Sequence, residues 1–494
     1  MKILIANPPA YIKNPNRHFV QAGSRWSFSM QIPKNSGCKD HYLPYPFFLG
    51  YSSALLKRNL DVKVNAIDAC ALDFDEKEFL RYVTSYKPDI LVMEVPTISF
   101  PLIMDLVKEV KDNIDCKIAI AGSHVTASVK ETLERHRFID YCLLGEYEIT
   151  LEELVKHLID KYDNGDLKKV RGLAFRNQGK VLINHKRELL KDLDSLPLPD
   201  RNDFPIERYH DFEIAGKPCA QIITSRGCPA SCIFCIERQV MYASPFYRQR
   251  NPAKVVDEVA LVKERYKAKQ VYFDDETMTV NRQHIASICN EIITRKLDIP
   301  WTCMGDITLA HETLKLMARA GCVGLKFGVE TVNTKTLTDI KKSFMNLDRV
   351  KQFVKWCKKL GLWTHATYMI GLPGDTKEDI SKTLDFAIKL DTDSAQFSIA
   401  TPFPGTPFFQ MAKENGWLAT YDWTMYDGAN HSVVNYPWLT KDEIEQLHRM
   451  ALKRYYRHAI IKSLVSPRKV FSLMRAKGLT YAFHKVMGTF RGGK

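Results

Sequence analysis

The stretch AQIITSRGCPASCIFC, residues 220–235, joins a short apolar run to three closely spaced cysteines. Residues 220–225 are typical of a buried strand, and Cys228, Cys232 and Cys235 follow with the spacing C-x3-C-x2-C. Structural zinc usually takes four closed ligands, often as two C-x2-C pairs, and the sequence has no second such pair. An iron–sulfur cluster that only transfers electrons also takes a cysteine at each iron. Three thiolates on a four-iron cluster would therefore leave one iron open to an external ligand.

Five more strand patterns follow the first one, and helical patterns separate them. The sequence predicts these strands at residues 270–275, 301–305, 323–329, 363–370 and 395–400. Six strand–helix units indicate a partial (β/α)6 barrel of the TIM type, in which functional groups lie at the carboxyl ends of the strands. The three cysteines then lie at the functional end of the first barrel strand.

An independent series of strands and helices precedes the cysteines. Strands rich in aliphatic residues are predicted at residues 2–7, 61–68, 88–95, 117–122 and 141–146. This alternation predicts a doubly wound, Rossmann-like α/β sheet, whose ligands lie beyond the carboxyl ends of the strands. The small and polar residues expected at those ends include Thr97, Gly122, Ser123, His124, Gly145 and Glu146.

These patterns predict four parts of the 494-residue chain. The first domain is expected at residues 1–165 and a connector at 166–217, with a hairpin around Gly179. The barrel is expected at residues 218–436, and a helical basic segment at 437–494.

The net charge of +14 comes mainly from the C-terminal tail. Residues 446–494 hold twelve Lys and Arg and no Asp or Glu, arranged as two amphipathic helical patterns separated at Ser466 and Pro467. A solvated or interdomain helix and a contact with a membrane surface or anionic partner are the open alternatives. Without a basic groove that carries interleaved aromatic residues, nucleic acid is not an expected partner.

The start of the chain has no signal-peptide pattern, and no apolar run is long enough to cross a bilayer. We therefore expect a cytoplasmic protein, peripheral at the membrane surface if the tail binds there. The nine cysteines outside the cluster are too dispersed for a disulfide scaffold and are expected to be buried free thiols.

With Phe234 before its last cysteine, the cysteine stretch reads C-x3-C-x-aromatic-C and resembles the radical S-adenosylmethionine (SAM) superfamily. The resemblance implies a [4Fe-4S] cluster held by Cys228, Cys232 and Cys235, with SAM on the open iron. Reductive cleavage of SAM would give methionine and a 5′-deoxyadenosyl radical. An electron donor such as flavodoxin or ferredoxin is then expected.

Three further stretches resemble the parts of that superfamily that contact SAM. In VYFDDETMT, the resemblance makes Asp274, Asp275 and Glu276 candidates to accept hydrogen bonds from the SAM amino group. In GLKFGVET, Glu330 matches an acidic residue that faces the ribose or amine, and in YMIGLPGDT, Gly371 and Gly374 would let backbone approach the adenine. Helix capping by the acids and ordinary turns at the glycines are the structural alternatives.

Residues 1–437 resemble the branch with an N-terminal cobalamin (B12)-binding domain, which includes the anaerobic magnesium-protoporphyrin ester cyclase and hopanoid-modifying enzymes. The matching segments include ILIANPP, PDILVMEVPT, AGSHVTASVKETL and DLDSLPLPDR. The resemblance implies cobalamin at the strand ends of the first domain. Two features depart from relatives: the D-x-H-x-x-G loop that ligates cobalt in many cobalamin domains is absent, and Asp306 stands where an arginine is common.

The resemblance leaves two enzyme reactions open. Radical methylation of an unactivated carbon would use SAM both as methyl donor and as radical source, and we favour it because it gives cobalamin a direct task. Radical oxidation or cyclisation without methyl transfer is the second. A non-catalytic cobalamin or redox-binding protein is the third reading, but it would be expected to have lost these motifs.

The substrate is expected to be a small hydrophobic molecule. Aromatic segments at residues 24–30, 44–51 and 420–431, together with the basic tail, favour an isoprenoid, a lipid or a tetrapyrrole. Core packing is the alternative explanation of these aromatic residues, and a soluble natural-product or glycan precursor is the alternative substrate.

Overall fold

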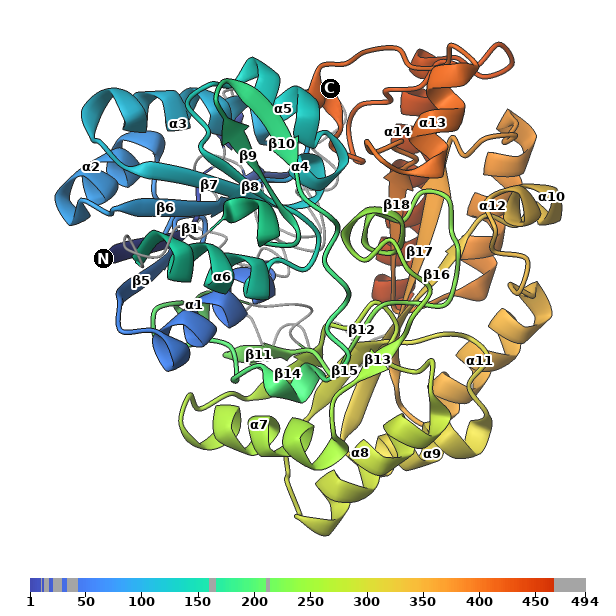
Figure 1. Cartoon of the computed structure of the whole chain (residues 1–494). Coiled ribbons are helices and arrows are strands. Elements are labelled where there is room, and N and C mark those ends of the chain that lie inside the picture. Colours follow the sequence, from blue (N-terminus) through green and yellow to red (C-terminus); the bar gives the residue numbers. More distant parts are fainter. Residues whose placement is uncertain are drawn as a thin grey trace.

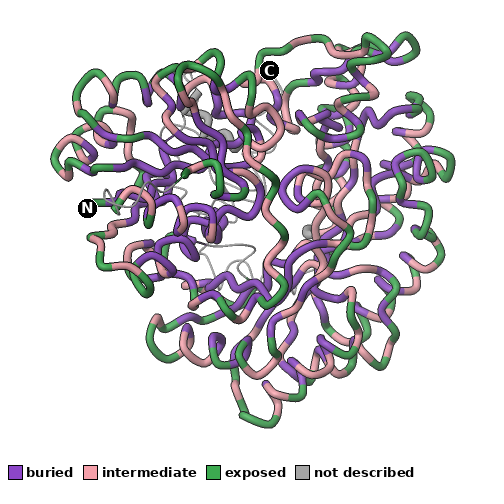
Figure 2. Tube along the Cα trace, viewed as in Figure 1, coloured by how far each residue is buried: buried purple, intermediate pink, exposed green. Residues whose placement is uncertain are grey.

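The computed structural model of the protein describes residues 1–9, 11–12, 17–20, 29–32, 43–159, 166–209 and 214–465. The chain forms two α/β bodies, each built around its own main sheet, which lie side by side in Figure 1. Buried residues are concentrated along the strands, and exposed residues on the outer helices and loops (Figure 2). The predicted α/β class with two successive strand–helix units is confirmed.

The first sheet contains the five predicted parallel strands. They are β1 (Lys2–Asn7), β5 (Lys63–Asp68), β6 (Ile90–Glu94), β7 (Lys117–Ala121) and β8 (Tyr141–Leu143), in the spatial order β8-β7-β6-β1-β5. Within β1, Ile3 packs with α1 (Phe47–Asn59) and α6 (Glu148–Ile159), whereas Leu4 packs with α2 (Glu76–Tyr86) and α3 (Phe100–Asn113). Helices therefore cover both faces, as a doubly wound sheet requires.

The predicted hairpin extends this sheet. Strands β9 (Leu173–Asn177) and β10 (Lys180–Ile183) are antiparallel, and β9 pairs with β8. Gln178 and Gly179 have φ values of 50° and 78°, as a two-residue turn of type I′ requires. The first sheet thus continues past residue 165, the expected end of the first domain, into the expected connector.

The second sheet has six parallel strands in chain order, with β11 and β18 at its edges. The strands are β11 (Cys219–Ile222), β14 (Gln270–Phe273), β15 (Trp301–Met304), β16 (Cys322–Glu330), β17 (Trp363–Ile370) and β18 (Ser394–Ile399). Helices α7 (Pro252–Glu264), α8 (Arg282–Thr294), α9 (His311–Arg319), α11 (Leu347–Lys359) and α12 (Lys377–Leu390) cover its outer face in Figure 1. This is the predicted partial barrel.

Shorter elements complete the described structure. Strands β2 (Tyr11–Ile12), β3 (Arg17–Val20) and β4 (Ser29–Ile32) form an antiparallel sheet, and β12 (Ser225–Arg226) pairs with β13 (Arg248–Gln249). The remaining short helices are α4 (Ser123–Ala127), α5 (Val129–Arg135), α10 (Thr334–Asp339) and α13 (Pro407–Glu414). Single 3-10 turns occupy Leu167–Lys169, Leu193–Ser195, Ile206–Arg208 and Trp423–Met425, and a π-helical turn occupies Glu237–Met241.

The last described helix, α14 (Lys441–Val465), packs against β18 and α12. The ring Nε2 of His448 donates to the Phe397 carbonyl oxygen (2.9 Å), and Arg454 pairs with Asp385 (2.8 Å). The helix ends beside the predicted break, while the second tail helix, expected after Pro467, lies outside the described residues. Part of the basic segment therefore belongs to the barrel.

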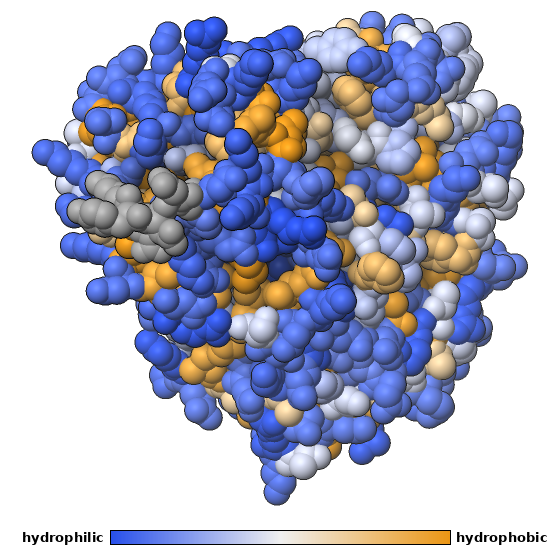
Figure 3. Space-filling view, viewed as in Figure 1, coloured by the Kyte–Doolittle hydropathy of each residue, from blue (hydrophilic) through white to orange (hydrophobic). Residues whose placement is uncertain are grey.

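The described surface is mixed in character. Figure 3 shows hydrophilic residues over most of one face, with hydrophobic patches between them. Among the described residues, no helix combines the length and the apolar character needed to cross a bilayer.

Candidate functional site

The loop that follows β12 carries the three predicted cluster cysteines, and they differ from the other cysteines in exposure. Cys228, Cys232 and Cys235 are half-buried, whereas the remaining eight described cysteines are buried free thiols, as predicted. Cys38 lies outside the described residues. In the described part of the chain, no three thiol, imidazole or carboxylate groups converge where a single metal ion could bind. In a four-iron cluster each thiolate binds a different iron, so the three thiol groups need not converge on a single metal ion.

Asp275 anchors the strand end that precedes these cysteines. Its buried carboxylate accepts hydrogen bonds from the amides of Thr224 (2.9 Å) and Ser225 (2.5 Å) and from their hydroxyl groups (3.1 and 2.7 Å). These bonds draw the backbone away from the sheet after Ile222, so the predicted strand at 220–225 is divided between β11 and β12. Asp275 thus holds the residues that lead into the cysteine loop.

Glu276 anchors the next part of the same loop. Its carboxylate accepts hydrogen bonds from the Gly227 amide (3.1 Å) and from the Tyr242 hydroxyl (3.1 Å). Asp274, the third predicted acid, is buried at the end of β14. The structure therefore brings the acidic stretch to the start of the cysteine loop, where Asp275 bonds to the residues before the loop and Glu276 bonds to Gly227 within it.

Glu330 ends β16 and forms an ion pair with Lys342 (2.5 Å), in which both side chains are buried. The segment with Lys342 is tied to the loop because the Ile233 amide donates to the Ile340 carbonyl oxygen (3.2 Å). Burial raises the pKa of the Cys232 thiol to about 11, against the opposing charge of Lys342. No motif marks Lys342, and it is absent from the predicted site.

The two predicted glycines of the fifth barrel strand end have different surroundings. A Cβ on Gly371 would lie 3.0 Å from Ile444 of α14, and its carbonyl oxygen accepts from the Tyr436 hydroxyl (2.9 Å). Its small size is therefore used for packing against the C-terminal helix. Gly374, with φ 89°, has only Asp339 and Thr336 within 4 Å of an added Cβ, at 3.9 Å each.

Thr97 and His124 come together at the ends of β6 and β7. The His124 Nδ1 lies 3.3 Å from the Thr97 hydroxyl, and the ring packs against Phe100 and Trp423 with centroid distances of 4.1 and 5.2 Å. Burial lowers the pKa of His124 to about 3, so the ring is neutral. Trp423 follows the last barrel strand, which means that the second body reaches the strand ends of the first.

Gly122 and Ser123 lie at the same edge of the first sheet. Gly122 has φ 108°, and a Cβ there would lie 2.9 Å from the Val95 carbonyl oxygen. Ser123 begins the short helix α4 directly after it. Four of the predicted cobalamin residues, Thr97, Gly122, Ser123 and His124, are therefore close together.

Glu146 connects the first body to the cysteine loop. It pairs with Arg226 (3.2 Å) and Arg248 (2.7 Å), and Glu148 pairs with Arg226 (2.6 Å). Burial raises the carboxylate pKa, but the two guanidinium groups outweigh it and hold the pKa of Glu146 below its ordinary value. Gly145, with φ 64°, lies against Met241, whose carbonyl oxygen would be 3.0 Å from an added Cβ. The sequence offers no signal for this buried pairing across the two bodies.

Asp306, the departure from relatives at the third barrel strand, holds local structure. Its carboxylate pairs with Arg282 (3.1 Å) and accepts from the Thr308 amide (2.7 Å). The ion pair with Arg282 accounts for an acidic residue at position 306, so no bound ligand is needed to explain it.

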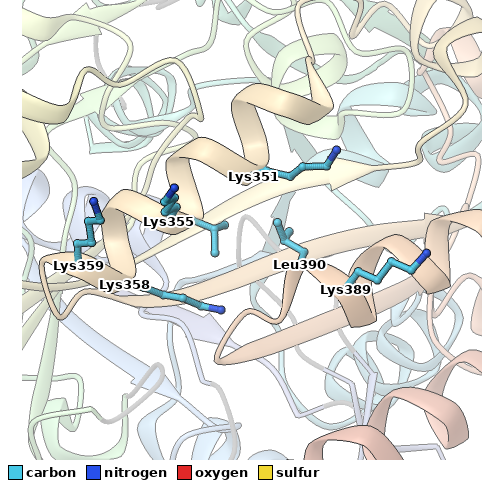
Figure 4. Close-up of a pocket in the computed structure, with 7 residues that line it drawn as sticks. Lys351, Lys355, Lys358, Lys359, Lys389 and Leu390 are labelled. Carbon is cyan, nitrogen blue, oxygen red and sulfur yellow. The ribbon is translucent and has the colours of Figure 1, made fainter.

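A basic hollow of about 470 Å³ lies on the outer helices of the barrel, where Figure 4 shows its lysine side chains. Two of these lysines are ion-paired, Lys358 with Asp391 (3.1 Å) and Lys351 with Asp348 (2.9 Å). The cysteine loop instead follows the carboxyl end of a barrel strand, so this hollow is not part of the predicted site. Its lining consists of Lys351, Val354, Lys355, Lys358, Lys359, Lys389 and Leu390.

Comparisons with known proteins match both bodies. Residues 222–387 match the family model of the Radical SAM superfamily, and residues 46–155 match the B12 binding domain. The uncharacterized methyltransferase PH0819 of Pyrococcus horikoshii is 30% identical over 83% of this chain and 87% of its own length. The anaerobic magnesium-protoporphyrin IX monomethyl ester cyclase of Cereibacter sphaeroides is 26% identical, over 77% of this chain and 62% of the cyclase.

A solved structure shares the fold of nearly the whole chain. The cobalamin-dependent S-adenosylmethionine radical enzyme OxsB, with aqua-cobalamin and S-adenosylmethionine bound, superposes with a TM-score of 0.68 at 14% identity. The match covers 99% of this chain and 72% of OxsB.

These matches confirm the resemblance, the fold and the predicted cofactors. The radical SAM domain implies a [4Fe-4S] cluster and SAM, which the three half-buried thiols fit, and the other domain implies cobalamin. The chain belongs to the radical SAM enzymes that carry an N-terminal B12-binding domain.

Proposed function

We propose that the protein is a methyltransferase that adds a methyl group to an unactivated carbon of a small molecule. When bound, the cluster and SAM supply a 5′-deoxyadenosyl radical, and cobalamin supplies the methyl group. The observation that carries the proposal is Arg226, which joins the cysteine loop to Glu146 and Glu148 at the end of β8. Because methyl transfer needs the radical and the methyl donor near one carbon, this direct connection favours it over oxidation alone.

In the second body, Cys228, Cys232 and Cys235 would hold the cluster, and Phe234 would pack beside it. Asp275 and Glu276 would act on SAM indirectly, because Asp275 bonds to the strand end before the cysteine loop and Glu276 bonds to Gly227 in the loop. Direct contact with SAM is assigned to Asp274 and Glu330, and approach of the adenine to Gly374. Gly371 is assigned a packing role against α14.

In the first body, Gly122 and Ser123 would provide the backbone edge along which cobalamin lies. His124 is assigned a positioning role rather than cobalt ligation, because its ring is packed between Phe100 and Trp423 and its Nδ1 contacts the Thr97 hydroxyl. Gly145 and Glu146 would connect the cobalamin edge to the cysteine loop.

The structure supports a hydrophobic substrate less than the sequence does. Segment 44–51 is buried in the core of the first body. Residues 24–28 lie outside the described residues, and residues 29 and 30 belong to the short strand β4. Segment 420–431 remains as a candidate lining. On β17 and β18, residues of the hydrophobic core alternate with the half-buried polar residues Thr367, Gln396 and Ser398. We therefore propose a substrate that has hydrogen-bonding groups in addition to an apolar part.

The test uses the full chain, reconstituted anaerobically with iron and sulfide and supplied with SAM, cobalamin and a strong reductant. We expect both 5′-deoxyadenosine and S-adenosylhomocysteine, because methyl transfer consumes SAM in two ways. Reduced flavodoxin or ferredoxin, the proposed physiological donor class, should replace the chemical reductant.

Two results would overturn the proposal at different levels. Deoxyadenosine without S-adenosylhomocysteine would indicate the oxidative or cyclase reaction, to which the Cereibacter relative's name points. Equal iron content in the wild type and in a Cys228/Cys232/Cys235 triple alanine variant would remove the cluster assignment.

A further inference from the structure

The buried ion pair of Glu330 and Lys342 lies beside the cysteine loop, and only Glu330 belongs to a motif of the sequence. Lys342 is 8% exposed and Glu330 7%, and their charged atoms are 2.5 Å apart. The carboxylate of Glu330 compensates for the burial of the lysine charge, because it lies within hydrogen-bond distance of the Lys342 ammonium group. Lys342 is therefore a buried cation at neutral pH.

One backbone hydrogen bond ties the segment with Lys342 to the loop, and two further backbone features accommodate the pair itself. The Ile233 amide, between two cluster cysteines, donates to the Ile340 carbonyl oxygen (3.2 Å). Glu330 has φ 68°, an uncommon conformation for a residue with a side chain. A Cβ on Gly328 would lie 2.2 Å from the Glu330 Oε1 and 2.8 Å from the Lys342 Nζ, so the pair occupies the space that this glycine leaves.

The two members of the pair act on the loop with opposite sign. Lys342 carries a positive charge and Glu330 a negative one, and the Ile233–Ile340 hydrogen bond ties the segment with Lys342 to the residues that would hold the cluster. Charges interact more strongly in a buried site than in water, because the effective dielectric constant is lower there. One-electron reduction adds a negative charge to a cluster held by this loop, so the same two charges must shift its reduction potential.

We propose that Lys342 and Glu330, in addition to the SAM contact proposed for Glu330, set the reduction potential of the cluster, Lys342 raising it and Glu330 lowering it. The inference rests on the proposed binding of the cluster by Cys228, Cys232 and Cys235. It gives the pair a task before SAM binds: adjusting how readily a low-potential, one-electron donor reduces the cluster.

The experiment is a redox titration of the reconstituted full chain without SAM, followed by electron paramagnetic resonance of the reduced cluster. We expect Lys342→Met to lower the midpoint potential, Glu330→Gln to raise it, and the double variant to fall between them. Lys342→Arg should stay closest to the wild type. Lys359→Met removes the same charge from the exposed surface of α11 and should leave the potential unchanged.

Iron content and the visible spectrum separate the possible failures. Unchanged midpoint potentials in both single variants, with wild-type iron content, would overturn the inference while the cluster assignment stands. A wild-type chain that holds no cluster would overturn the proposed function first. If Lys342→Met does not retain a cluster, Glu330→Gln still tests the inference. It keeps the shape of the side chain, and it is expected to raise the midpoint potential rather than lower it.

Discussion

At the residue scale, the cysteine loop depends on Gly227. Its φ is 92°, and an added Cβ would lie 2.2 Å from the Phe246 carbonyl oxygen, so the backbone must move to admit one. We expect Gly227→Ala to lower the iron bound per chain severalfold after reconstitution. Gly179→Ala is the matched control, since Gly179 has φ 78° with nothing within 4 Å of the added Cβ. It should cost about 1 kcal/mol and leave iron content unchanged; equal iron in both variants would contradict the role of Gly227.

Glu94, buried at the end of β6, predicts a pH effect. Burial raises its pKa from 4.5 to about 8, against a hydrogen bond from the Tyr147 hydroxyl (3.3 Å). The folded state thus retains a proton that the unfolded chain releases, so this contribution to stability is complete below pH 4.5 and is lost as pH rises through about 8.

The glutamine side chain of the Glu94→Gln variant is neutral at every pH. The free energy of unfolding of the variant relative to the wild type should therefore increase by up to about 4 kcal/mol between about pH 5 and about pH 8. Urea unfolding at several pH values measures this difference. The exposed carboxylate variant Glu134→Gln serves as control and should show a difference that is nearly independent of pH. A flat profile for Glu94→Gln would mean that Glu94 is ionised in the folded protein.

At the scale of elements, the connection between β8 and the cysteine loop rests on Arg226. Its guanidinium pairs with Glu146 and Glu148 and lies 5.1 Å from the ring centroids of Phe48 and Tyr51. Removing the cation leaves buried carboxylates without compensation, so we expect Arg226→Met to destabilise the fold by about 3–5 kcal/mol.

Chemical unfolding measures that loss of stability, and two further variants serve as comparisons. Arg135→Met breaks an exposed pair with Glu131 (2.9 Å) and should cost less than about 1 kcal/mol. Adding Glu148→Gln to Arg226→Met should recover part of the loss, because it removes one of the unpaired charges. Equal losses for Arg226→Met and Arg135→Met would show that the buried network does not hold the two elements together.

The same elements show what a sequence can predict. Strands β1 and β17 begin and end at the predicted residues, because aliphatic runs between polar turns identify buried strands. The three cysteines follow from their spacing. Lys342 cannot be predicted in this way, because its role depends on a turn that brings it back to Glu330. The pairing of Arg226 with Glu146 cannot be predicted either, because the two residues are 80 positions apart in the chain. Such long-range pairs leave no periodic pattern in the sequence.

At the scale of the whole molecule, two separately predictable bodies are joined by contacts that concentrate on the candidate site. Arg226 and Arg248 reach Glu146, Met241 lies against Gly145, and Trp423 packs on His124. Each contact joins a strand end of the first sheet to a segment near the cysteine loop or beyond the last barrel strand. If the cofactors bind at these strand ends as proposed, these contacts would bring the two binding regions together, as methyl transfer between them would require.

The C-terminal tail gives the last prediction at this scale. Arg454 and Lys462 pair with Asp385 and Asp391 of the barrel, so the chain through Val465 belongs to the folded unit. Residues 466–494 add seven Lys and Arg and no acid. Basic residues near an anionic membrane contribute roughly 1 kcal/mol each, so deleting 466–494 should weaken binding to anionic vesicles by roughly tenfold or more. Cosedimentation at low and high salt measures this, with neutral vesicles as the control. Equal binding by the full and shortened chains would assign the tail to contacts within the protein instead.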